Sequence, residues 1–175
     1  MLRALTTLTF VYVPREDRIL AAINAGHAEA WSCWLTRRLA LAVLERTAEY
    51  LATRSDLAQR APADLRGETV KFERDAAIAK TAPAMSITPA AILQSSVAGA
   101  ELAERLTISP QGQGFHLELR GQGEQGAAAT LKRAELQRIL QMLQIEAAKG
   151  GWLAMAAKPQ AAPPDAAAAP KPARH

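Results

Sequence analysis

The chain has 175 residues, of which 49% are hydrophobic and 22% charged, enough to bury the core of one domain without metals or disulfides. Its single cysteine, Cys33, excludes an intramolecular disulfide, which fits a reducing compartment. The sequence does not begin with a basic segment followed by a long apolar run, so we expect no signal peptide. No window reaches the ~18 uninterrupted apolar residues of a membrane span. We therefore expect a cytoplasmic protein with no membrane span.

The net charge of +4 suggests nucleic-acid binding, but its distribution weakens that interpretation. Residues 155–175 contain three basic residues and one acidic residue, so this segment carries half of the net charge. In the rest of the chain acids and bases alternate, as in residues 66–75. This pattern is typical of a solvated face of mixed charge rather than a stripe that binds phosphates.

The first third of the chain predicts three strands and a helix. Residues 5–13 are rich in threonine, valine and aromatic side chains and predict a strand, which ends at Pro14. Residues 19–23 and 30–35 predict two further strands, although alanine leaves a helical turn open for the first of them. Thr36 is a good N-cap for a helix that runs to about Arg54, where we expect Ser55 and Asp56 to restart or bend it.

The middle of the chain predicts an insertion, and the end repeats the strands. Pro62 suits the first turn of an exposed, charged helix over residues 63–80, and Pro83 and Pro89 indicate a linker. Residues 91–102 show no clear pattern. We expect strands over residues 105–109, 115–120 and 127–131, and a helix from about Arg133 that ends at Gly150-Gly151. The Ala/Pro-rich tail over residues 154–175 cannot bury enough surface to order, so we expect it to be disordered.

Shifting the chain by 96 residues aligns these two sets of elements in one order and one register. The identities are few and include Pro14/Pro110, Leu35/Leu131, Arg37/Arg133 and Leu44/Leu140. So few identities also fit chance, and any β-meander followed by a helix resembles another. The pattern predicts one α+β domain over residues 1–153, built from an internal duplication. Unit one covers residues 5–54, a helical insertion and linker cover 55–102, and unit two covers 103–150. The units would share one sheet or form two layers.

No catalytic or metal-binding pattern is present. The histidines His27, His116 and His175 have neither metal-ligand spacing nor a neighbouring cluster of acids. Cys33 lies in a predicted half-buried strand, where cysteine usually acts as a small apolar residue. Residues 121–126 spell G-x-G-x-x-G, but a strand rather than a helix is predicted to follow, which favours a hairpin loop over a phosphate site. We expect no cofactor.

Five residues are candidates for binding a partner. Trp31 and Trp34 lie on opposite faces of their strand, so one should pack in the core while the other faces a second layer or a partner. Arg37 and Arg38 begin the first long helix and Arg133 the last, where the helix dipole opposes positive charge. They could bind an acidic partner or a phosphate, or be solvated.

These observations favour a non-catalytic protein-protein interaction protein, an accessory subunit or assembly factor that docks on a larger partner or on itself. The first alternative is a nucleic-acid-binding protein that uses the basic helix starts. The second is a small-ligand binder or enzyme with a pocket between the two units.

Overall fold

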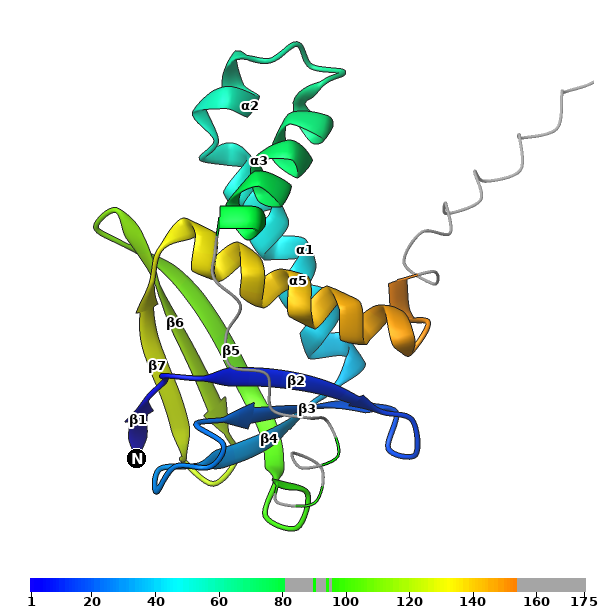
Figure 1. Ribbon diagram of the computed structural model, residues 1–175, viewed down its shortest axis with the longest axis vertical. Helices are drawn as coiled ribbons and strands as arrows, with labels where there is room; N and C mark the ends of the chain where they lie inside the picture. Colours follow the sequence, from blue (N-terminus) through cyan, green and yellow to red (C-terminus); the bar gives the residue numbers. More distant parts are fainter. Residues whose placement is uncertain (81–89, 91–93, 95, 154–175) are drawn as a thin grey trace, which may run out of the picture.

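The structure is a computed structural model that describes residues 1–80, 90, 94 and 96–153 (Figure 1). The predicted linker between Pro83 and Pro89 and the predicted disordered tail lie outside the described residues. The α+β class is confirmed. Within the described ranges, one mixed sheet has the strand order β1-β7-β6-β5-β4-β3-β2, and four helices accompany it.

The first unit consists of three antiparallel strands and a helix. Its elements are β2 (Leu8–Val13), β3 (Arg18–Ile23), β4 (Trp31–Leu35) and α1 (Arg37–Thr53). The helix begins where the sequence predicts, because the Thr36 hydroxyl accepts a hydrogen bond from Leu39 N at 3.2 Å.

The second unit repeats this arrangement at the predicted offset. It consists of β5 (Glu101–Gln111), β6 (Gly114–Gly121), β7 (Gly126–Leu131) and α5 (Arg133–Lys149). The bounds of α5 are those of α1 shifted by 96 residues. Ile19 pairs with Leu35 in the first unit, and Phe115 pairs with Leu131 at the equivalent place in the second. The two units share one sheet, joined where β4 and β5 run parallel.

In the helical insertion the chain restarts as a helix at Ser55 and Asp56, one of the two expected outcomes there, and the helix predicted over residues 63–80 begins three residues later. The insertion contains a short helix α2 (Asp56–Arg60) and a longer helix α3 (Arg66–Lys80). Ser55 caps α2 by accepting a hydrogen bond from Ala58 N at 2.9 Å. The helix α2 lies beyond the end of α1, and α3 runs back from it and packs against α5 (Figure 1).

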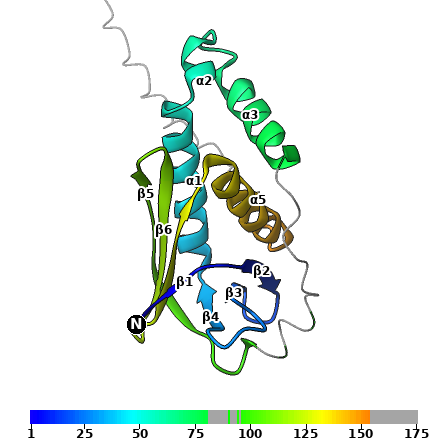
Figure 2. The same cartoon turned by 60° about the vertical axis from the view of Figure 1, so that its left-hand side comes forward.

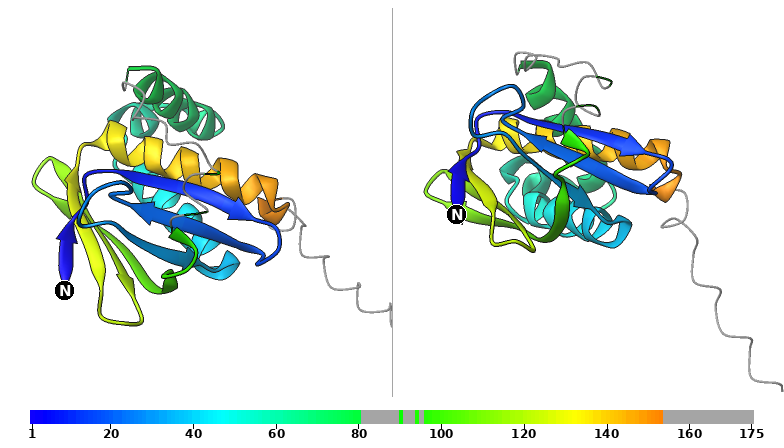
Figure 3. Two further views of the ribbon diagram at one scale, coloured as in Figure 1. Left: turned by 60° about the horizontal axis from the view of Figure 1, so that its bottom comes forward. Right: turned by 90° about the horizontal axis from the view of Figure 1, so that it is seen from below.

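The predicted strand over residues 5–13 is wrong at its start. A separate strand, β1 (Leu2–Ala4), pairs in parallel with β7 of the second unit, and β2 begins only at Leu8. The buried Asn24 side chain holds the bend between them, because its carbonyl oxygen accepts hydrogen bonds from Thr6 N and Thr7 N and its amide donates to Ala4 O. The N-terminal segment thereby contacts both ends of the sheet, which is strongly curved (Figure 3).

The main core lies on the concave face of this sheet, under α1 and α5. Alternate residues of each strand point into it, because side chains alternate between the faces of a strand. Buried members from the sheet and both helices are Ile19, Cys33, Leu117, Leu119, Val43, Leu136 and Leu143.

Candidate protein-binding sites

Trp31 and Trp34 lie on opposite faces of β4, as their spacing predicts, and both are buried. Trp31 belongs to the main core, and its indole N–H donates to Glu101 Oε1 at 2.7 Å. Trp34 is 9% exposed and packs in a second cluster on the convex face of the first unit. The second unit has polar residues at the positions equivalent to that cluster, since His116 stands where Leu20 is and Thr130 where Trp34 is. Binding of a partner by either tryptophan stays a prediction.

The G-x-G-x-x-G segment surrounds the carboxylate of Glu101. It forms the hairpin between β6 and β7, and Gly123 N donates to Glu101 Oε2. A side chain at Gly121 or Gly123 would overlap Glu101. The first two glycines therefore make room for a carboxylate of the chain itself, and this carboxylate links the hairpin to Trp31 of the first unit.

Cys33 and His116 lie on opposite faces of the sheet. The Cys33 thiol is fully buried, and burial followed by the charge of Glu101 raises its pKa, so the thiol stays protonated at neutral pH. His116 lies on the convex face of β6, with Nε2 3.7 Å from Glu118 Oε2. Among the described residues, no group of three or more His, Cys, Asp or Glu side chains could hold a metal ion.

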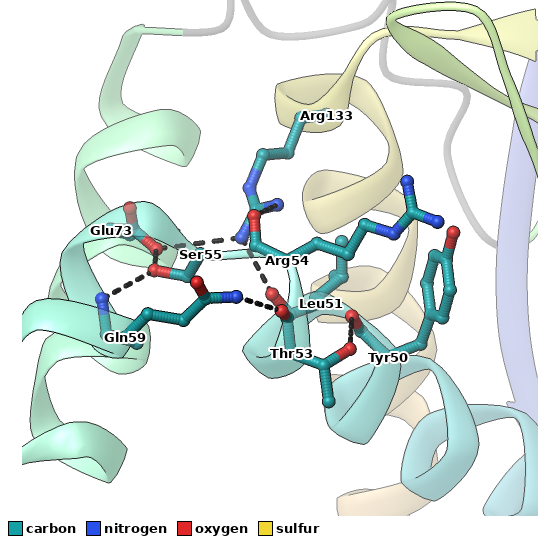
Figure 4. Close-up of polar contacts among 9 residues, drawn as sticks. Tyr50, Leu51, Thr53, Arg54, Ser55, Gln59, Glu73 and Arg133 are labelled. Atoms are coloured by element: carbon teal, nitrogen blue, oxygen red, sulfur yellow. Dashed lines mark hydrogen bonds and ion pairs between the residues drawn. The ribbon is translucent and has the colours of Figure 1, made fainter.

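Arg133 connects the start of α5 to the end of α1 (Figure 4). Its guanidinium donates to Leu51 O at 3.0 Å and to Arg54 O at 3.3 Å, two of the last carbonyls of α1. It also lies 3.6 Å from Glu73 of α3, which accepts a hydrogen bond from Ser55. The dipole of α5 opposes the positive charge of Arg133 at the start of that helix. The dipole of α1 favours the same charge, because it lies at the end of α1.

Arg37 has the equivalent place at the other end of the two helices. Its guanidinium forms an ion pair of 2.9 Å with Asp17 and lies 5.5 Å from the ring of Trp152, just after α5. The arginine at the start of each long helix therefore contacts the region where the other helix ends. Sequence reasoning missed this role because it treated each helix alone. Arg38 is exposed.

An open cleft lies between α1 and β5, with a volume of about 430 Å³. From α1 it is lined by Leu39, Ala42, Val43, Arg46, Thr47 and Tyr50, and from β5 by Arg105, Leu106, Thr107 and Ile108. Arg46 and Arg105 are its charged residues, both are exposed, and neither is paired with a carboxylate among the described residues. Figure 2 shows α1 of the first unit running beside β5 of the second, and the residues that line the cleft come from these two elements.

The helical insertion carries exposed apolar side chains. Phe72 of α3 is 71% exposed, Leu57 of α2 is 56% exposed, and Leu65, which directly precedes α3, is 50% exposed. Sequence reasoning treated this segment as a charged helix. A lone aromatic residue among the charges of residues 66–75 was the signal that could have indicated more.

The chain matches no family model, no curated protein and no solved structure. None of the helices in the described ranges is both long enough and apolar enough to span a membrane.

Proposed function

We propose that the protein is a non-catalytic accessory subunit or assembly factor that binds a protein partner through its helical insertion. The observation that carries this proposal is the exposure of Phe72, a large aromatic side chain on helix α3 of the insertion. Burying a phenylalanine side chain against a partner stabilises a complex by about 1.5–3 kcal/mol. Aromatic residues are also enriched where proteins bind one another.

The surroundings of Phe72 suit an interface. Leu65 and Leu57 add apolar surface on the same insertion, while Glu68, Lys71 and Asp75 provide charges around it. An apolar centre with a polar rim is the usual composition of a protein-protein interface. The nucleic-acid alternative depended on the basic helix starts, and the contacts of Arg37 and Arg133 with their own chain weaken its support.

The test compares the full chain with two variants in affinity capture from native lysate and in size-exclusion chromatography with light scattering. Phe72→Ala should lower the amount of each specifically captured protein, or the fraction of self-associated protein, by tenfold or more. Ile145→Ala is the matched control, since Ile145 is 50% exposed but lies on α5. Equal binding by Phe72→Ala and the unmodified chain would contradict the proposal, and so would a strict monomer that captures nothing.

A further inference from the structure

The strand β5 has an open edge along most of its length. On one side β5 pairs with β6 from Ala103 to Gln111. On the other side, within the described residues, β4 pairs only with Glu101 and Leu102 before the chain turns into α1. An unpaired strand edge presents backbone N–H and C=O groups that another extended segment can pair with.

The register shows which backbone groups face outward. Gln111 and Gly114 close the two-residue turn between β5 and β6 and so form a hydrogen-bonded pair. Such pairs recur at every second residue, so Leu106 and Ile108 direct their N–H and C=O groups away from β6. Pro110 also faces outward but has no N–H, and the edge that a partner can use ends there.

The equivalent strand of the first unit has its outward N–H group bound by a carboxylate. Tyr12 in β2 is equivalent to Ile108, and Tyr12 N donates to Glu146 Oε2 of α5 at 2.8 Å. The residue of α1 equivalent to Glu146 is Tyr50. Tyr50 offers no acceptor to this edge in the described structure, and its buried hydroxyl has no hydrogen-bond partner there. The chain thus satisfies one outward N–H internally and leaves the equivalent one open.

The side chains beside the open edge of β5 indicate which kinds of residue a bound segment would carry. Leu39, Val43 and Leu106 provide apolar contacts, whereas Arg46 and Arg105 provide two positive charges without a carboxylate partner in the described structure. A strand added to an edge alternates its side chains between two faces. Apolar residues at alternate positions would therefore meet the apolar lining on the α1 side, while acidic residues between them face the side of Arg105. The long side chain of Arg46 on α1 adds a second positive charge beside the strand.

We propose that the α1–β5 cleft binds an extended acidic segment of a protein partner, which adds a strand to the sheet at Leu106 and Ile108. This site is separate from the insertion around Phe72, so a partner could use either site alone.

The probe is an acetylated, amidated and fluorescently labelled eight-residue peptide that alternates valine with glutamate and threonine. Fluorescence anisotropy with the full chain should show saturable binding with a dissociation constant below about 1 mM. In the ¹⁵N spectrum of the protein, the amide signals of Leu106 and Ile108 should shift. A peptide with lysine in place of glutamate, and one with N-methyl groups at alternate residues, should each bind at least tenfold more weakly.

Variants of the protein test the same contacts from the other side. The double variant Arg46→Glu/Arg105→Glu should weaken binding of the glutamate peptide at least tenfold. Arg15→Glu is the matched control, because Arg15 is exposed in the turn after β2 and should leave binding unchanged. The variant Phe72→Ala should also leave peptide binding unchanged, which separates this site from the insertion.

Three results would overturn the proposal. They are no binding up to about 1 mM, equal binding of the lysine peptide, and signal shifts that fall on α3 instead of β5. A dimer that dissociates in Arg46→Glu/Arg105→Glu would assign the open edge to a second copy of the chain and would also reject the proposed occupant. None of these results affects the test made with Phe72→Ala.

Discussion

The protein contains two equivalent crossings, in each of which the long helix of one unit runs over the first strand of the other unit's meander, and the two crossings differ in how they are packed. Where α5 crosses β2, Phe10 of the strand and Met142 and Leu143 of the helix pack into the core. Where α1 crosses β5, the equivalent residues are Leu106, Arg46 and Thr47, and an open cleft remains. The same backbone arrangement therefore produces a closed core in one place and an accessible groove in the other.

The difference shows what the repeat requires and what it leaves free to vary. Both units keep the three-stranded meander, the helix and the arginine that begins the helix. Two things decide whether the strand edge is covered. One is the volume of the side chains at the three positions compared above, and the other is the presence of a carboxylate at Glu146. The smaller and charged residues lie at the crossing where the partner segment is proposed to bind.

The largest expected loss of folding stability comes from removing side-chain atoms where α5 crosses β2. Leu143 is 1% exposed, and Leu143→Ala should destabilise the fold by about 2–5 kcal/mol through lost apolar contact and the cavity that remains. Thr47→Ala at the equivalent position should cost about 1 kcal/mol or less, because it removes fewer atoms beside an existing cleft. Urea denaturation followed by circular dichroism measures both. Equal losses would show that the two crossings are packed alike.

A smaller loss of folding stability is expected when the Tyr12 N–H at the edge of β2 loses its acceptor, Glu146. Glu146→Ala should leave Tyr12 N partly buried without an acceptor and cost about 1–3 kcal/mol. Glu146→Gln keeps an acceptor oxygen and should cost less. The same denaturation experiment compares the two variants, and protection of the Tyr12 amide from hydrogen exchange should fall further in Glu146→Ala. Unchanged protection in both variants would remove the role assigned to this carboxylate.

Much of each unit could be predicted from the sequence because its signals are local. The alternation in β6, the Thr36 cap and the apolar stripe of α5 depend on residues that are close along the chain. The pairing of β1 with β7 was missed, since it joins residues more than a hundred positions apart and leaves no periodic pattern.

The candidate sites were harder to predict for a related reason. The contacts of Arg37 and Arg133 depend on where the other long helix ends, which no single segment records. The cleft depends on β4 ending before β5 does, so that the helix α1 follows where a neighbouring strand would continue. The exposure of Phe72 depends on which side of α3 packs against α5. Arrangement in space, rather than residue type, decides each of these features.

The smallest expected effect concerns the helix end that Arg37 contacts. Asp17 accepts hydrogen bonds from the Trp152 indole and the Tyr12 hydroxyl, each at 3.0 Å, and pairs with Arg37. The hydrogen bonds, with Arg37, hold the pKa of the Asp17 carboxyl below its usual value. A carboxyl with a lowered pKa in the folded state stabilises the fold above its unfolded pKa of about 3.9, and this contribution is lost as the pH falls below that value.

The variant Asp17→Asn should therefore melt at a lower temperature than the unmodified chain near pH 6, and the difference should shrink as the pH falls below about 4. Thermal unfolding monitored by circular dichroism at several pH values measures the difference. Glu16→Gln in the same turn is the control, since Glu16 is exposed and should give no such trend. At the other end of the two long helices, the main partners of Arg133 are backbone carbonyls, which do not titrate. If the loss of melting temperature in Asp17→Asn did not change with pH, the charge of Asp17 would not contribute to stability. The proposed contrast between a titrating contact of Arg37 and non-titrating contacts of Arg133 would then be wrong.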